Sequence, residues 1–174
     1  MFKQINMKKI SLFLLLLIGT LAYSQAGTMT IYNFSSSTVS YRLVGSQLNA
    51  LQIDCQPVVT GYSATSLAPS STVTYPSYNT SHLQSPAINE WNVISEEIGI
   101  PSQTYNVAGG ATINPPITTL TAWHTIDLNF PNGGYINLGI HCGGAGTGIF
   151  SGSTTGNITA TWNMLGNNVI VFIN

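Results

Sequence analysis

The sequence predicts an all-β domain: a two-layer antiparallel β-sandwich of about eight to ten strands, in an immunoglobulin-like or jelly-roll-like arrangement. Two observations predict it. Val, Ile, Thr and Tyr recur in short alternating runs, which is the periodicity of half-buried strands. Clusters of Gly, Pro, Asn and Ser separate these runs and supply turn residues. Only 5% of the 174 residues are charged, so hydroxyl and amide groups must keep the surface soluble.

The first 24 residues resemble a secretory signal peptide. Lys3, Lys8 and Lys9 precede an apolar run of about 13 residues, and small residues follow that run. A helix that spans a bilayer needs about 20 apolar residues, so we expect export rather than a membrane span. Cleavage before Gln25, with Gly27 as the alternative, leaves one domain of residues 25–174. That domain would be extracellular or periplasmic.

The chain beyond the leader is acidic and almost free of basic residues. Arg42 is its single basic residue, and it is opposed by Asp54, Glu90, Glu96, Glu97 and Asp127, a formal charge of −4. Nucleic acids and anionic lipids are bound by clustered Lys and Arg, so neither is an expected partner. The stretch GGAGTG at 143–148 lacks the glycine spacing of a dinucleotide site and the lysine of a phosphate-binding loop. No cofactor and no metal are predicted.

Eight segments carry strand-like patterns. They are residues 28–33, 38–44, 48–55, 71–75, 120–130, 135–142, 158–164 and 169–173. The last segment is apolar on both faces, so we expect it in the centre of a sheet; pairing with another chain is the alternative.

One short helix is predicted near residues 86–98. Ser85 could cap it, and Pro86 would take its first position. Apolar residues recur at helical spacing in this segment, namely Ile88, Trp91, Ile94 and Ile98. The competing interpretation is a strand, because WNVI at 91–94 also has a strand-like composition.

Residues 120–130 and 135–142 are predicted to form a hairpin around PNGG. One face of the first strand carries Leu120, Ala122, His124, Ile126, Leu128 and Phe130, and one face of the second carries Ile136, Leu138, Ile140 and Cys142. A three-residue loop at 132–134 places these sets opposite each other and pairs Leu128 with Leu138. A two-residue turn would instead set each apolar set opposite a polar one.

The two cysteines are predicted to form a disulfide. Cys142 ends the buried row of its strand, and Cys55 ends the row that contains Leu51 and Ile53. Two such cysteines in an exported chain favour a Cys55–Cys142 bond. The alternative is two buried free thiols.

The outer face of the same hairpin is the predicted ligand site. It would present Trp123, Thr125, Asp127, Asn129, Tyr135, Asn137 and His141 together. An aromatic ring flanked by carboxylate, amide and imidazole groups suits a carbohydrate, because rings pack on the apolar faces of sugars while polar groups bind the hydroxyls. The competing interpretation is an ordinary polar outer face.

We therefore expect a secreted, non-catalytic binding or adhesion module that prefers a glycan or another cell-surface polymer. A secreted hydrolase of an extracellular polymer is the first alternative, and it would need His82 or His141 to converge with an acid and a serine. A structural subunit of a cell-surface assembly is the second. No catalytic residue is assigned, and the acidic group of Glu90 with Glu96 or Glu97 is interpreted as solvated charge rather than a glycosidase pair.

Overall fold

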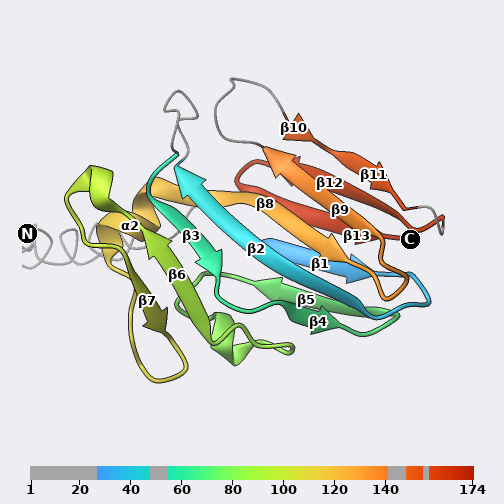
Figure 1. Cartoon of the computed structure of the whole chain (residues 1–174), viewed down its shortest axis with the longest axis horizontal. Coiled ribbons are helices and arrows are strands. Elements are labelled where there is room, and N and C mark those ends of the chain that lie inside the picture. Colours follow the sequence, from blue (N-terminus) through green and yellow to red (C-terminus); the bar gives the residue numbers. More distant parts are fainter. Residues whose placement is uncertain (1–26, 48–54, 141–147, 155–156) are drawn as a thin grey trace, which may run out of the picture.

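A computed structural model describes residues 27–47, 55–140, 148–154 and 157–174 of the chain. Thirteen strands in these ranges form two sheets that pack face to face, so the predicted all-β sandwich is confirmed (Figure 1). The strand number exceeds the expected eight to ten because several short strands, among them β10 (Gly148–Ile149) and β11 (Ser151–Ser153), are too brief to show alternation. The predicted signal peptide lies outside the described residues.

The smaller sheet has five strands in the order β11-β12-β13-β1-β5. Its other members are β1 (Met29–Asn33), β5 (Ser71–Tyr75), β12 (Thr159–Leu165) and β13 (Asn168–Ile173). The β1 and β13 strands pair in parallel, whereas the other pairs of this sheet are antiparallel. The sandwich was expected to be antiparallel throughout, and this one pair differs from that expectation. Because β13 lies between β12 and β1, the prediction that the last segment is central is confirmed.

The larger sheet has eight strands. Seven follow the order β10-β9-β8-β2-β3-β6-β7, and β4 (Thr65–Leu67) pairs with β2. The bounds are β2 (Val39–Gln47), β3 (Val58–Gly61), β6 (Glu90–Ile94), β7 (Gln103–Asn106), β8 (Thr121–Asn129) and β9 (Tyr135–Ile140). The predicted strand at 48–55 falls on residues outside the described ranges, except for Cys55. Cys55 is fully buried just before β3.

The prediction of a helix near residues 86–98 is wrong. This segment forms β6 and a single 3₁₀ turn, η2 (Glu96–Ile98), because β3 and β7 flank it and pair with it. Trp91 and Val93 face the core while Asn92 and Ile94 face outward, so strand pairing overrides the helical spacing. The other short helices lie elsewhere, as α2 (Pro115–Leu120) and η1 (Ser81–Leu83).

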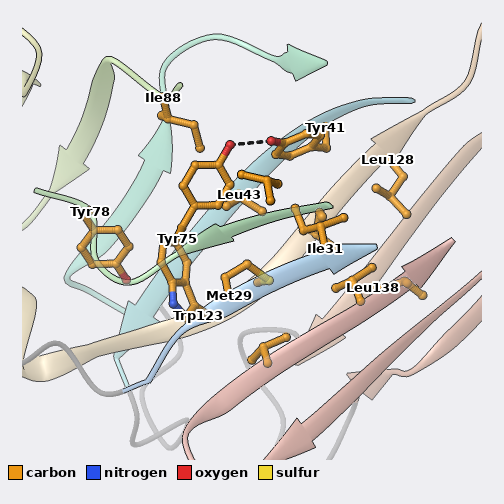
Figure 2. Packing of buried hydrophobic residues seen from close by; sticks show 14 of the residues in the cluster. Met29, Ile31, Tyr41, Leu43, Tyr75, Tyr78, Ile88, Trp123, Leu128 and Leu138 are labelled. Atoms are coloured by element: carbon orange, nitrogen blue, oxygen red, sulfur yellow. Dashed lines mark hydrogen bonds between the residues drawn. The ribbon is translucent and has the colours of Figure 1, made fainter. Parts of the chain in front are cut away.

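Inward-facing side chains of both sheets form one core (Figure 2). At its centre the hydroxyl groups of Tyr41 and Tyr75 lie 2.5 Å apart, and Tyr75 donates to the carbonyl of Pro86 at 2.7 Å. Because the single hydroxyl proton of Tyr75 is used in that bond, the hydroxyl of Tyr41 donates to Tyr75. Two polar atoms are thereby buried with their hydrogen-bonding needs met.

These buried tyrosines predict a loss of stability at high pH. Burial raises the pKa of Tyr75 from 10.0 to about 12, and burial raises the pKa of Tyr41 as well. Above pH 10 the unfolded chain releases these protons while the native chain keeps them, so the stabilisation is complete below pH 10 and declines as the pH rises toward the folded pKa. Each such tyrosine contributes a slope of up to about 1.4 kcal/mol per pH unit.

The measurement is urea denaturation of the wild type and Tyr75→Phe from about pH 9 to about pH 11.5. At the lower pH the variant should have a smaller free energy of unfolding than the wild type. As the pH rises, its free energy of unfolding should decrease less than that of the wild type. Parallel curves for the two proteins would show that Tyr75 is not the buried, protonated group described above.

Candidate functional site

The β8–β9 hairpin differs from its prediction by one position in the turn. The loop has three residues, as expected, but they are residues 131–133. The carbonyl of Phe130 accepts a hydrogen bond from the amide of Gly133 at 3.0 Å, and the amide of Phe130 donates to the carbonyl of Gly134 at 2.9 Å. Gly133 has a φ of 79°, which is the left-handed position that such a loop requires. Leu128 therefore pairs with Ile136 rather than Leu138.

Most of the predicted inward faces survive this correction, because partners shift by two residues and a shift of two preserves the face. Ile136 and Leu138 are buried, and Ile140 is half-buried. Ile126 and Leu128 of β8 are buried opposite them.

The first half of β8 contradicts the prediction, because a β-bulge reverses its alternation. Val44 of β2 pairs with Thr125, but the next residue, Gly45, pairs with Trp123, which leaves His124 as an extra residue in β8. Before the bulge the odd-numbered residues of β8 face inward, so Thr121 and Trp123 are buried while Ala122, which was expected in the core, is half-buried. Leu120, also expected in the core, ends α2 instead of belonging to β8, and its side chain is 38% exposed.

Trp123 is consequently a core residue and is not on the outer face. Its side chain is 2% exposed, and its Nε1 donates to the carbonyl of Gly27 at 3.3 Å. Its ring packs edge-on against Tyr78 with centroids 4.8 Å apart (Figure 2). The ring of Trp91 lies 5.0 Å from that of Tyr78 and 6.0 Å from that of Trp123. The predicted sugar site on the outer face of the hairpin therefore does not include Trp123.

Two glycines beside the bulge were the signal that could have located it. Gly139 of β9 lies opposite Thr125 with a φ of 119°, and a Cβ there would stand 2.1 Å from the carbonyl oxygen of His124. Gly45 lies beneath Tyr78, where a Cβ would stand 1.7 Å from the tyrosine hydroxyl. Glycine inside a strand indicates a bulge or a close approach of this kind.

A polar cluster remains on the outer face of the hairpin. The hydroxyl of Tyr135 donates to Oδ1 of Asp127 at 2.7 Å, and Nδ2 of Asn137 donates to the same oxygen at 2.6 Å. The hydrogen bond to Asp127 is the main reason that the pKa of Tyr135 is raised. The parity of β8 places Thr125 and Asn129 on this face as well. His141, the remaining predicted member, lies outside the described residues.

The smaller sheet carries a second candidate site that the sequence did not reveal. We call it the aromatic face, defined by Tyr32, Phe34 and Phe172 on the solvent side of β1 and β13. Their ring centroids lie 5.2–6.2 Å apart, and their ring planes differ by 13–22°. Phe34 is 59% exposed, and the other two rings are half-buried. Three aromatic rings are thus in mutual contact at the surface.

Small neutral side chains border these rings in two rows. The first row crosses all five strands in register, and its members are Thr72, Tyr32, Phe172, Thr161 and Ser151. The second row consists of Thr74, Thr30, Ile170 and Asn163, with the hydroxyls of Thr30 and Thr74 in hydrogen-bonding contact at 3.1 Å. Hydroxyl and amide side chains therefore border the aromatic face, together with the apolar side chain of Ile170.

Charge is divided unequally between the two sheets. The five strands of the smaller sheet contain no charged residue. The charged residues that the structure describes lie in or beside the larger sheet, namely Arg42, Glu90, Glu96, Glu97 and Asp127. The strands that carry the aromatic face thus present no charged side chain.

The features required by the hydrolase alternative are not assembled around His82. Within the described residues this imidazole forms no hydrogen bond or ion pair with an acid or a serine, and its Nδ1 is buried without a partner. The neighbouring Ser81 donates to the carbonyls of Tyr78 and Ile88. The same ranges contain no group of three or more His, Cys, Asp or Glu side chains that could hold a metal ion.

The fold and these surfaces define the class as a β-sandwich domain with a neutral aromatic sheet face. No protein-family model, no curated protein and no solved structure matches the chain. In the ranges that the structure describes, no helix has the length and apolarity needed to cross a membrane.

Proposed function

We propose that this protein is an exported, non-catalytic module that binds a neutral polysaccharide through the aromatic face. The observation that carries the proposal is the contact of three surface rings on a sheet without charged residues. Export rests on the leader sequence alone. The proposal keeps the ligand class that the composition predicted and moves its location to the other sheet.

The chemistry of the face suits a sugar polymer. Aromatic rings pack against the C–H faces of sugars, and threonine, serine and asparagine both donate to and accept from sugar hydroxyls. A single exposed ring on a soluble protein would require no explanation. Three rings in contact, with Thr72 and Thr161 on either side in the same row, form a contiguous patch of the kind that marks a binding site.

The polar cluster of Asp127, Tyr135 and Asn137 is the alternative location for the same ligand class. Its hydrogen bonds hold the three side chains in fixed positions, which favours selective binding of hydroxyls. Its exposed ring is Tyr135, at 58%, nearly the same exposure as Phe34. The two faces can therefore be compared with matched aromatic substitutions.

The first test measures binding of the mature protein to a panel of neutral glycans, with Phe34→Ala and Tyr135→Ala as the matched pair. Loss of the Phe34 ring should weaken binding about tenfold, a difference of about 1.4 kcal/mol. Tyr135→Ala should stay within about twofold of the wild type. The reverse result would move the site to the β8–β9 hairpin, and no binding to any glycan would overturn the proposed function.

Salt provides a second test. Because the smaller sheet contains no charged residue, the affinity for the glycan should be nearly constant between about 0.05 and about 0.5 M NaCl. The measurement is the glycan affinity at each salt concentration. A steep decrease would show that charged groups, which belong to the other sheet, dominate the contact.

We also propose that Cys55 pairs with Cys142, as expected for an exported chain. Cys55 is fully buried, and the described residues contain no free cysteine; Cys142 lies outside them. The test is alkylation of the denatured mature protein, followed by intact mass measurement. Label should enter at both cysteines only after reduction. Labelling without reduction would contradict the disulfide.

A further inference from the structure

We infer that a hollow in the larger sheet, separate from the aromatic face, binds a single sugar residue through Glu90. The hollow lies where the β3–β4 turn meets the beginning of β6 and the end of β7. Its volume is about 460 Å³, and its polar lining residues are Ser63, Thr65, Asn89, Glu90 and Asn106. Three alanines and Ile88 complete the lining.

The carboxylate of Glu90 is held in position with one oxygen left for a ligand. Glu90 and Asn106 are register partners, and Nδ2 of Asn106 donates to Oε1 of Glu90 at 3.1 Å. The amide of Gly109 donates to Oδ1 of Asn106 at 2.7 Å, so the asparagine side chain is fixed at both ends. Among the described residues no donor bonds to Oε2 of the half-buried Glu90.

The other polar groups of the hollow are also available. Within the described part of the chain, the side chains of Ser63, Thr65 and Asn89 form no hydrogen bond, although the backbone carbonyl of Asn89 accepts two amides. A fixed carboxylate beside unbonded hydroxyl and amide groups matches a small ligand that is rich in donors. The volume is within the range of small-molecule sites, which is about 300–1,000 Å³.

A sugar residue meets these requirements. Its hydroxyls can donate to Glu90 and also accept from Asn89, Ser63 and Thr65. The amide of Tyr62, the residue before Ser63, bonds to the carbonyl of Glu90 at 3.0 Å and so ties the β3–β4 turn to the start of β6 beside the hollow. A neutral sugar and an amino sugar share this donor chemistry, and an ammonium group would add a charge interaction with Glu90.

This site lies on the other sheet from the aromatic face and does not depend on it. A module with both sites would contact a polymer along its length with the smaller sheet and hold a terminal or branching residue in the hollow. Simultaneous use of the two sites would raise the apparent affinity through effective concentration, but only for a glycan long or branched enough to reach both sheets.

The test is calorimetric titration of the full mature chain with glucose, galactose, mannose and glucosamine, using the wild type, Glu90→Gln and Glu96→Gln. Glu96 is exposed in η2, so its substitution removes the same charge outside the hollow. At least one sugar should bind, and Glu90→Gln should weaken it at least about tenfold while Glu96→Gln leaves it unchanged. Tighter binding of glucosamine than of glucose would identify the ligand as an amino sugar. Equal binding of the two would identify it as a neutral sugar.

Two results would overturn the site: no binding of any of the four sugars, or equal behaviour of the two glutamate variants. Phe34→Ala separates this inference from the proposed function. That substitution should leave monosaccharide binding intact while weakening polysaccharide binding. A monosaccharide site that is lost with Phe34 would belong to the aromatic face instead.

Discussion

Replacing Trp123 with alanine should destabilise the domain by about 3–5 kcal/mol, the usual cost of removing a large buried aromatic side chain. The ring is 2% exposed and contacts Tyr78 and Trp91, and its Nε1 bonds to the carbonyl of Gly27. The substitution would leave a cavity that the surrounding rings cannot fill without moving. Urea denaturation of wild type and variant measures the difference.

Tyr135→Ala is the control for Trp123→Ala, because Tyr135 belongs to the same hairpin and is 58% exposed. Its loss should change the free energy of unfolding by less than about 1 kcal/mol. If Trp123→Ala unfolded like the wild type and instead abolished glycan binding, Trp123 would be a surface ligand residue. The placement of the β-bulge at His124, which turns Trp123 into the core, would then be wrong.

Replacing Gly139 with alanine should destabilise the domain by about 4 kcal/mol or prevent folding, because it combines backbone strain with a clash. Gly139 has a φ of 119°, and a Cβ would stand 2.1 Å from a backbone oxygen that cannot rotate away. The β8–β9 pairing would have to separate at the bulge. The free energy of unfolding and the yield of folded protein are the measurements.

Gly133→Ala is the matched control in the same hairpin. Its φ is also positive, at 79°, but no atom lies within 4 Å of the added Cβ. Only the strain of a left-handed alanine remains, about 1 kcal/mol. Equal effects of the two substitutions would show that the clash at Gly139 is absent and that the register of β9 differs from the one described.

Local pattern was sufficient to locate most of the long strands. The segment at 71–75 coincides with β5, and those at 28–33 and 169–173 differ from β1 and β13 by one residue at one end. In these strands one face is buried and the other is not, so alternation along the chain reports the fold directly. The length of the β8–β9 loop followed from the same reasoning, together with the left-handed glycine that it requires.

Features that depend on neighbouring strands could not be placed from local pattern alone. The bulge at His124 reverses the face of Trp123 because β2 and β9 present Gly45 and Gly139 beside it. The helical spacing around Trp91 was misleading, since β3 and β7 pair with this segment on both sides. In each case tertiary pairing decided between two locally acceptable structures.

The aromatic face was missed for the same reason. Tyr32 lies in β1 and Phe34 directly follows it, but Phe172 lies 138 residues beyond Phe34. Only the parallel pairing of β1 with β13 brings these rings together. Parallel pairing of the first and last strands has no local signature comparable to a hairpin turn. Surface sites composed of distant strands therefore require the fold before they can be recognised.

Hydrogen–deuterium exchange of residues 25–174, with and without a bound neutral polysaccharide, tests the location of the binding surface most directly. We predict that the glycan slows exchange in β1 and β13, around Tyr32, Phe34 and Phe172, and leaves the β8–β9 hairpin unchanged. Protection confined to the hairpin around Asp127 and Tyr135, with none in β1 or β13, would contradict the assignment of polysaccharide binding to the aromatic face.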